Sequence, residues 1–169
     1  SAFGIENPRV GLINIGTEEE KGPDIVKEAN VQLRESRLNY VGNIESRDLF
    51  DGVTDIAVTD GFTGNVILKL IEGASTFFFG EIKNVISKNL KSKLGAFFLK
   101  DGLYGLKRKL DADVNGGAPI LGVDGLVIKS HGSSKARTIK YVILRAKVLA
   151  ESNFIEDMKH EFMSVPAEK

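Results

Sequence analysis

The sequence contains no cysteine, which excludes disulfide bonds, thiolate metal sites and a cysteine nucleophile. An intracellular protein is the simpler interpretation of that absence. Net charge is absent as well, because 23 basic side chains balance 23 acidic ones, so the chain as a whole does not attract nucleic acid or an anionic membrane. Any electrostatic partner must therefore bind to a local patch.

Targeting and membrane-spanning signals are also missing. Residues 1–8 have neither a basic start nor an apolar run, so no secretory signal is predicted. Glu72, Glu81 and Lys83 interrupt the longest apolar stretch before it reaches the roughly 18 to 20 residues that cross a bilayer. We expect no membrane span, and the missing initial Met favours a piece of a longer protein.

Three common motifs of nucleotide-binding and hydrolytic enzymes do not occur. No G-x-G-x-x-G follows a predicted strand and no G-x-x-x-x-G-K-[ST] is present, which argues against dinucleotide and P-loop sites. A G-x-S-x-G turn is absent too, which argues against a serine hydrolase of that class.

The apolar pattern predicts an α/β chain in which short strands alternate with helices. Strands are predicted at 10–15, 38–41 and 55–58, helices at 23–36 and 65–90, and a helical patch at 47–50. Gly95, Gly102 and Gly105 are predicted to break the helical pattern after residue 90. The sheet is expected to be mostly parallel, because helices separate its strands.

The last third of the chain predicts a β-hairpin and a closing helix. The segment 117–128 has two β-rich arms around Asp124-Gly125, a strong hairpin signal. Ser133 or Ser134 is predicted to cap a helix whose apolar stripe packs on the sheet. Without repeats or a linker, residues 1–169 are predicted to form a single α/β unit.

Two glycine-containing turns follow predicted strands and could hold an anion. Asp60-Gly61-Phe62-Thr63-Gly64-Asn65 follows 55–58, where glycine amides, two polar side chains and a helix start favour phosphate. Ser130-His131-Gly132-Ser133-Ser134 repeats this arrangement and adds an imidazole suited to proton transfer. The alternatives stay open: Thr63 caps a helix, and His131 is a structural side chain.

Asn14, at the end of the first predicted strand, and Asn115-Gly116-Gly117-Ala118-Pro119 are further candidates, the latter because adjacent glycines allow close backbone approach. The alternative for the second is a tight entry to the hairpin. Glu18, Glu19 and Glu20 are interpreted as a solvated turn rather than a metal site, and no metal is predicted.

A basic and aromatic segment is predicted to protrude at 77–110. Between residues 82 and 110 it has eight basic side chains and one acidic one, an excess of eight minus one, or +7. Its aromatic residues add apolar bulk, as in interfacial helices and in grooves for acidic partners. The alternatives are a solvated basic face and a dimer contact.

Together, four motifs in this order resemble the PlsX family over nearly the whole chain. They are Asn7-Pro8-Arg9-Val10-Gly11-Leu12-Ile13-Asn14-Ile15-Gly16, Asp60 to Asn65, Gly116-Gly117-Ala118-Pro119 and His131-Gly132-Ser133-Ser134. The resemblance implies an acyl-acyl carrier protein:phosphate acyltransferase that makes acyl phosphate for bacterial phospholipid synthesis. It also implies the carboxyl-terminal half of a longer, homodimeric enzyme.

The fold implied by the resemblance is a three-layer α/β/α sandwich with a mostly parallel sheet, similar to isocitrate and isopropylmalate dehydrogenases, with a β-hairpin and a long helical hairpin. The implied partners are acyl carrier protein and inorganic phosphate, with no nucleic acid and no cofactor. A cytoplasmic enzyme is expected, with peripheral contact to the inner face of an anionic membrane. The alternatives are an enzyme acting on a coenzyme A thioester and a non-catalytic docking or dimerisation module.

For this chemistry, catalytic roles are predicted for Asp60, Asn65 and His131. Phosphate or thioester is predicted to bind at Asn14, Gly61, Thr63, Gly64, Gly116, Gly117, Gly132, Ser133 and Ser134. Contact with the carrier protein or the membrane is predicted for Lys91, Lys93, Phe97, Phe98, Lys107, Arg108 and Lys109.

Overall fold

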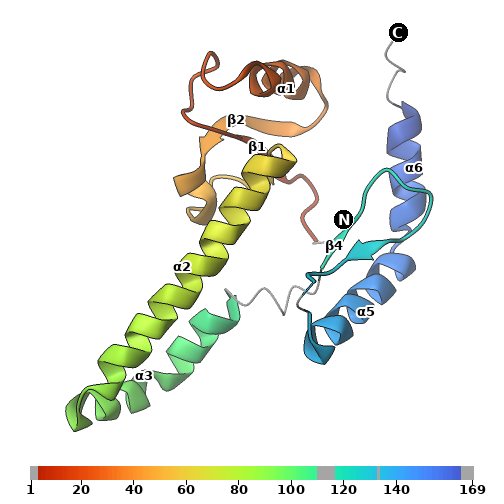
Figure 1. The fold of residues 1–169 in the computed structure, drawn as a ribbon. Helices are drawn as coiled ribbons and strands as arrows, with labels where there is room; N and C mark the ends of the chain where they lie inside the picture. Colours follow the sequence, from red (N-terminus) through yellow and green to blue (C-terminus); the bar gives the residue numbers. More distant parts are fainter. Residues whose placement is uncertain (1–3, 110–116, 133, 165–169) are drawn as a thin grey trace. The chain divides into compact units, whose positions relative to one another are not determined.

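The computed structural model describes residues 4–109, 117–132 and 134–164, and their contacts form two compact units. The first unit ends at Ala74 and the second begins at Ser75, so one helix, α2 (Gly61–Ser87), contributes to both. The order of elements along the chain can be followed in Figure 1. The sequence predicted a single α/β unit over 1–169, and that organisation stays a prediction.

The first unit is built on a three-stranded parallel sheet. Its strands are β1 (Arg9–Asn14), β2 (Asn39–Glu45) and β3 (Ile56–Val58), in the order β2-β1-β3. The central strand β1 is buried almost throughout, and Val10, Leu12 and Ile13 form the apolar core with Ile44 of β2. Burial of these side chains explains why the apolar run at 10–15 was recognisable as a strand.

Helix α1 (Asp24–Glu35) contacts β1 and β2, and a short 3₁₀ helix, η1 (Ser46–Phe50), follows β2. The prediction that Pro23 lies in the first turn of this helix was wrong by one residue, because α1 begins at Asp24 and Pro23 is the residue before it. The predicted parallel α/β arrangement is therefore confirmed for this part of the chain.

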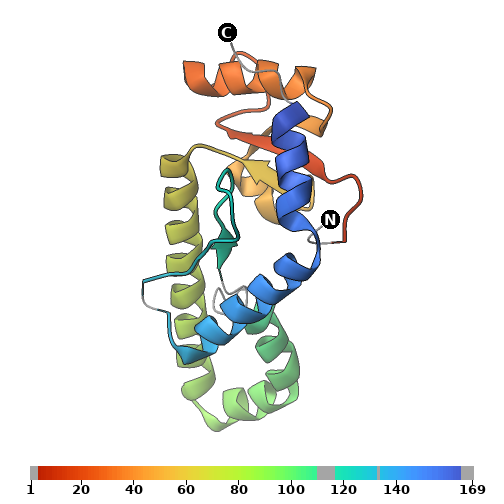
Figure 2. The ribbon, with the colours of Figure 1, turned by 90° about the vertical axis from the view of Figure 1, so that its right-hand side faces the viewer.

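The second unit contains the end of α2, a second long helix and a small hairpin. Helix α3 (Leu90–Lys109) follows α2 after a reversal at Lys88 and Asn89, and the two helices diverge from that reversal (Figures 1 and 2). The Oδ1 of Asn89 accepts a hydrogen bond from the backbone N–H of Ser92 at 2.8 Å, so Asn89 caps α3.

The prediction that Gly95, Gly102 and Gly105 break the helical pattern was wrong, since all three lie inside α3. Each interior glycine costs about 1 kcal/mol relative to alanine, but the leucine, lysine and alanine residues around them favour helix. The predicted helix at 65–90 also begins earlier and ends earlier, at Gly61 and Ser87.

The hairpin pairs β4 (Ala118–Pro119) with β5 (Ile128–Lys129) in antiparallel register. The N–H of Ile120 also donates to the carbonyl of Val127 at 2.8 Å. Continuing this register places the reversal at Val123 and Asp124, one residue before the predicted Asp124-Gly125 centre. The hairpin is thus confirmed, with shorter strands than its arms predicted.

The closing helix, α5 (Ala136–Glu151), is capped by Lys135, which makes no side-chain capping bond. The predicted Ser134 cap was therefore wrong, and Ser133 lies outside the described residues. Helix α5 contacts α6 (Phe154–Ser164), and the apolar residues Ile139 and Ile143 of its predicted stripe are exposed. The Lys159 ammonium pairs with the Asp124 carboxylate at 2.9 Å and connects α6 to the hairpin.

Candidate active site

The ends of the three parallel strands lie at one edge of the sheet in the first unit. In the strand register Asn14 pairs with Glu45, and Leu12 pairs with Val58. Because the strands are parallel, the residues that follow them meet at the same edge, where open α/β sheets usually bind ligands. The structure therefore brings Asn14 and the turn 60–65 to one edge of the sheet.

Asp60 is the cap of α2. Its Oδ1 accepts hydrogen bonds from the backbone N–H groups of Phe62 and Thr63, both at 2.9 Å, and its carbonyl accepts the N–H of Gly64. The pKa of Asp60 is lowered, first by a hydrogen bond from the Thr63 side chain and then by the Thr63 N–H. The turn does cap a helix, but the interpretation of Thr63 as the cap was wrong, because Asp60 is the cap and Thr63 lies inside α2.

This cap changes what the turn offers an anion. The Phe62 and Thr63 amides, which would face a bound phosphate, already donate to an ionised carboxylate. Positive potential at the helix start is partly offset by that charge. Thr63 lies in the first turn of α2 with its side chain hydrogen-bonded to Asp60, and the side chain of Asn65, the fifth residue of the helix, is exposed.

The two glycines of the turn differ in their surroundings. A Cβ on Gly64 would come within 2.9 Å of Cγ2 of Thr59, so Gly64 allows the turn to close against the end of β3. A Cβ on Gly61 would meet no atom within 4 Å. Gly64 is therefore needed for close approach, whereas Gly61 leaves open space beside the turn.

The side-chain amide of Asn14 is engaged at both ends by the segment 15–22. Its Nδ2 donates to the carbonyl of Lys21 at 2.9 Å, and its Oδ1 accepts the N–H of Ile15 at 2.8 Å. Gly22 lies directly against this amide, has a φ of +87°, and leaves no room for a Cβ. Asn14 thus shapes the segment after β1.

Two further buried asparagines continue this network. Nδ2 of Asn43 donates to the carbonyl of Glu18 at 2.9 Å, and its Oδ1 accepts from Nδ2 of Asn30 at 3.1 Å. Nε of Arg34 donates to Asn30, while its Nη2 pairs with Glu19 at 2.6 Å. We define Asn14, Asn30 and Asn43 as the asparagine network.

The sequence prediction missed Asn30 and Asn43. The signal for Asn30 is its place on α1: it lies four residues after Val26 and three before Leu33, on the apolar stripe of an amphipathic helix. A buried polar side chain needs a hydrogen-bond partner, so its position on that stripe indicates an internal polar contact.

In the second unit, Gly117 and the segment after β5 lie together. The register that pairs Ala118 with Lys129 places Gly117 opposite Ser130, and a Cβ on Gly117 would come within 2.6 Å of the carbonyl oxygen of Lys129. The close backbone contact at Gly117 is thus with the second strand of the hairpin, as the alternative of a tight entry to the hairpin predicted, and phosphate binding at this segment stays a prediction. Gly116 lies outside the described residues.

The turn after β5 is held by serine and backbone contacts. The hydroxyl oxygens of Ser130 and Ser134 are 2.6 Å apart, and the N–H of Ser134 donates to the carbonyl of His131 at 3.0 Å. His131 and Gly132 are exposed at the tip of this turn. The predicted residues therefore form two groups, one in each unit.

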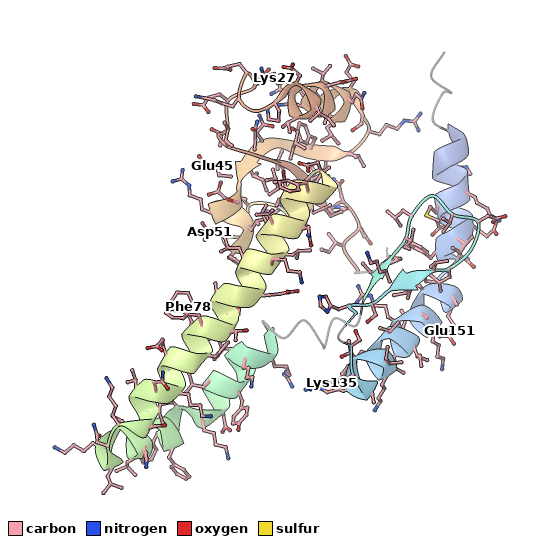
Figure 3. The ribbon with its side chains drawn as sticks, viewed as in Figure 1. Lys27, Glu45, Asp51, Phe78, Lys135 and Glu151 are labelled. Carbon is pink, nitrogen blue, oxygen red and sulfur yellow. The ribbon has the colours of Figure 1, made fainter. Side chains whose placement is uncertain are left out.

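The predicted docking surface lies on α3 and is exposed. Phe97 and Phe98 are 70% and 76% exposed and make an edge-to-face ring contact at 5.7 Å. On α2, Phe78 likewise projects from the helix (Figure 3). Lys91, Lys93, Lys107 and Arg108 are also on α3, and a hollow beside it is lined by Tyr104, Lys107, Arg108 and Arg137 among others. The side chain of Lys109 lies outside the described residues.

Within the part of the chain that the structure describes, no helix is long and apolar enough to cross a membrane. No group of three or more His, Asp or Glu side chains is placed to hold a metal ion among those same residues.

Comparison with known proteins places the chain in a family. The model of the fatty acid synthesis protein family matches residues 1–157. The chain belongs to this family. The PlsX resemblance inferred from the four sequence motifs is thereby confirmed.

Curated relatives of this family member are bacterial proteins named phosphate acyltransferase. The one from Acetivibrio thermocellus is 53% identical over 166 residues, which are 98% of this chain and 49% of the relative. The relative from Caldanaerobacter subterraneus subsp. tengcongensis is 46% identical over 94% of this chain and 48% of its own length. The relative from Thermoanaerobacter pseudethanolicus is 44% identical over 96% of this chain and 49% of its own length. The chain spans about half the length of the curated relatives it matches.

Proposed function

We propose that this chain is the carboxyl-terminal part of a phosphate acyltransferase, which transfers a fatty acyl group from acyl-acyl carrier protein to inorganic phosphate. The product is acyl phosphate for phospholipid synthesis. The observation that carries the proposal is the 53% identity to a phosphate acyltransferase over almost the whole chain. The two groups of polar turn residues at strand ends support it.

In the proposed reaction a phosphate oxygen attacks the thioester carbonyl, the new C–O bond forms, and the C–S bond breaks. No covalent enzyme intermediate is required. In this proposal Thr63, Asn65 and Ser133 orient phosphate or stabilise the developing oxyanion, and Asn14 and the glycines of both turns are further substrate-binding residues. His131 protonates the departing thiolate, and Asp60 orients the Thr63 turn through its cap.

Alanine variants of the full-length enzyme test these roles. His131→Ala and Asn65→Ala should each reduce acyl phosphate formation about 10²-fold or more if the residue acts in the transition state. His160→Ala is the matched control, because His160 is exposed on α6. Wild-type turnover in either variant removes that residue from the mechanism.

The donor is tested by supplying acyl-acyl carrier protein and acyl coenzyme A in parallel. The exposed basic and aromatic surface of α3 favours an acidic carrier protein over a free coenzyme A thioester. We expect the carrier-protein substrate to react with the higher kcat/KM. Equal or better use of coenzyme A would support the alternative enzyme, and no acyl phosphate from either donor would support a non-catalytic module.

The wider assembly belongs to the same proposal. The complete enzyme is a cytoplasmic homodimer with a three-layer α/β/α sandwich of the isocitrate dehydrogenase type. Residues 77–110 contact the carrier protein or an anionic membrane at its inner face. The apolar exposure of Phe97 and Phe98 supports a partner at this surface.

A further inference from the structure

A phosphate dianion needs positive charge, and the turn 60–65 provides no positively charged side chain. Thr63 and Asn65 are neutral, Asp60 is an anion, and the amides of Phe62 and Thr63 already bind the Asp60 carboxylate. Phosphate-binding sites usually add lysine or arginine to backbone donors. A cation near this edge of the sheet would complete the site.

Most basic side chains of the first unit already have an acidic partner. The ion pairs are Arg9 with Asp55, Lys27 with Asp24, Arg34 with Glu19, Arg47 with Glu45 and Asp48, and Lys69 with Glu72. Over residues 4–74 of the described chain, Lys21 and Arg37 are the basic residues for which no ion pair is found.

The positions of these two cations differ. Arg37 lies just before β2 and therefore at the amino-terminal edge of the parallel sheet. Lys21 lies in the segment that follows β1, and its carbonyl is bonded to Asn14, the last residue of that strand. Of the two, Lys21 is therefore at the edge that carries the turn 60–65.

The segment 15–22 is held in a defined conformation at this edge. Asn14 binds the carbonyl of Lys21, Asn43 binds the carbonyl of Glu18, and the N–H of Lys21 donates to that same Glu18 carbonyl at 3.3 Å. The Lys21 side chain lies beside Gly16, with its Cγ 3.3 Å from where a Cβ of Gly16 would be. The lysine stem is thus positioned at the end of the central strand.

Acidic neighbours do not cancel this charge directly. Glu19 is paired with Arg34 at 2.6 Å, and the Glu18 carboxylate is folded back over Gly16. Neither forms an ion pair with Lys21 within 4 Å in the described chain. The ammonium is therefore available to an anion that enters from solvent.

We infer that Lys21 is the phosphate-binding cation of the site, and that the asparagine network positions it. This inference rests on the proposed function, since it names a further residue for the same substrate. Lys21 supplies the charge that the capped helix start lacks, and Asn14 and Asn43 fix the backbone from which it projects.

The test compares Lys21→Met, Lys21→Arg and Arg37→Met in the full-length enzyme. Lys21→Met should raise the KM for inorganic phosphate about 10- to 100-fold, the range expected for losing a hydrogen bond from a charged donor, and leave the KM for the acyl donor unchanged. Lys21→Arg should recover part of the phosphate affinity, and Arg37→Met should behave as wild type. A wild-type KM for phosphate in Lys21→Met overturns the inference.

Calorimetry with inorganic phosphate separates this inference from the proposed function. If the wild-type protein binds phosphate and Lys21→Met binds it more weakly, the phosphate-binding role of Lys21 is supported. This holds even if the acyl donor is not the carrier protein. Binding that is equal in both proteins rejects Lys21 while leaving the reaction intact. A wild-type protein that neither binds phosphate nor forms acyl phosphate rejects both.

The positioning role needs its own variant. Asn14→Asp keeps an acceptor for the Ile15 N–H but replaces the donor to the Lys21 carbonyl with an oxygen. We expect a higher KM for phosphate with a smaller change in kcat, at a temperature where the variant is fully folded. A change in kcat with an unchanged KM for phosphate contradicts the positioning role. So does a variant in which neither constant changes.

Discussion

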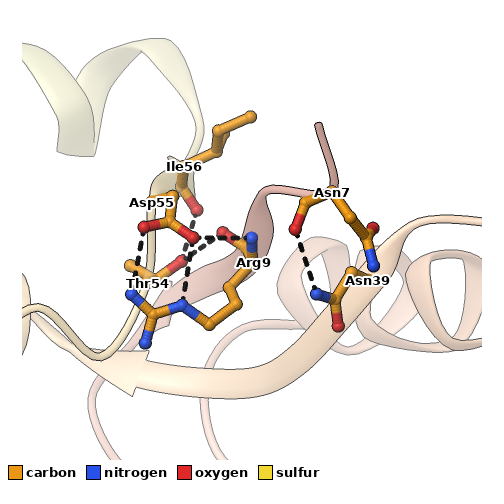
Figure 4. Close-up of polar contacts among 6 residues, drawn as sticks. All are labelled: Asn7, Arg9, Asn39, Thr54, Asp55 and Ile56. Atoms are coloured by element: carbon orange, nitrogen blue, oxygen red, sulfur yellow. Dashed lines mark hydrogen bonds and ion pairs between the residues drawn. The ribbon is translucent and has the colours of Figure 1, made fainter. Parts of the chain in front are cut away.

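Arg9 and Asp55 form a two-pronged ion pair between the start of β1 and the residue before β3. Nε and Nη2 of Arg9 donate to Oδ2 and Oδ1 of Asp55, both at 3.0 Å, and the backbone N–H of Arg9 donates to Oδ2 at 2.8 Å (Figure 4). The pair holds two neighbouring strands at the amino-terminal edge of the sheet. Thr54 adds a bond from its hydroxyl to the carbonyl of Arg9.

This pair predicts a pH dependence of stability. The hydrogen bonds from Arg9 lower the pKa of Asp55 from 3.8 to about 2. A carboxyl with a lowered folded-state pKa stabilises the fold above its unfolded pKa, and that contribution is lost as the pH falls through the folded value. Arg9→Met should therefore be less stable than wild type at pH 5, and the difference should shrink between about pH 4 and pH 2.

Urea unfolding at a series of pH values measures that difference, and carbon NMR of the carboxyl groups gives the pKa of Asp55 directly. Lys27→Met is the control, because its ion pair with Asp24 is long and exposed. A difference that stays constant down to pH 2 would show that Arg9 does not act through the Asp55 carboxylate.

Gly22→Ala should destabilise the protein by more than the ordinary cost of left-handed backbone. Gly22 has a φ of +87°, and its missing Cβ leaves room for the Asn14 amide. The backbone cost is about 1 kcal/mol, and displacing a buried amide should add about 1–3 kcal/mol. Gly52→Ala is the matched control, since Gly52 has a φ of +69° with open space around it.

Thermal and urea unfolding of both glycine variants give the comparison. If Gly22→Ala and Gly52→Ala lose the same free energy of unfolding, the contact of residue 22 with Asn14 adds nothing to the cost of Gly22→Ala.

Asn43→Asp should remove one hydrogen bond of the asparagine network while leaving the packing around residue 43 nearly unchanged. The near-isosteric aspartate still accepts from Asn30 but can no longer donate to the carbonyl of Glu18. We expect a loss of about 3 kcal/mol in the free energy of unfolding and faster hydrogen exchange over 15–21, because a buried charge faces a carbonyl.

Asn39→Asp serves as the comparison on the same strand. Asn39 lies at the other end of β2 and makes one long bond, 3.3 Å, to the carbonyl of Asn7 (Figure 4). A loss of stability in Asn39→Asp as large as in Asn43→Asp would show that the effect is not specific to the network.

Phe97→Ser combined with Phe98→Ser should reduce binding to anionic lipid vesicles if this surface contacts a membrane. Both rings are largely exposed, and each exposed aromatic side chain gains free energy on burial. We expect loss of at least about tenfold in the vesicle partition coefficient, measured by co-sedimentation in the full-length protein. Phe50→Ser is the control, since Phe50 is equally exposed but lies in η1.

If the double variant binds vesicles as well as wild type, its affinity for acyl carrier protein and its oligomeric state decide between the other expected partners.

Local patterns were sufficient to predict the first unit because its elements follow simple periodicities. β1 is a continuous apolar run buried on both faces, and α1 carries an amphipathic stripe that ends near Ser36. The parallel sheet followed from strands separated by helices. The start of α2 was placed four residues late, because Gly61 and Gly64 are weak helix formers and the Asp60 cap overrides their propensity.

The second unit was harder to predict because few of its residues are buried. Thr138 and Leu149 are the buried residues of the described part of this unit, so its apolar pattern does not indicate which contacts form within it. The turns at 60–65 and 130–134 could be found from glycine and polar side chains. Of the asparagine network, only Asn30 has a periodic signal, its place on the apolar stripe of α1; the hydrogen bonds of Asn14 and Asn43 join residues distant in the sequence and leave no such signal.

The asparagine network also has a consequence for chemical ageing. Each of its amides is followed in the sequence by a β-branched residue, namely Ile15, Val31 and Ile44. Asparagine is a thermolabile residue, and its deamidation begins with attack by the next backbone nitrogen on the side chain. Bulk at the following residue and burial of the amide both hinder that attack, so the bonds that hold Lys21 in place are also protected against conversion to aspartate.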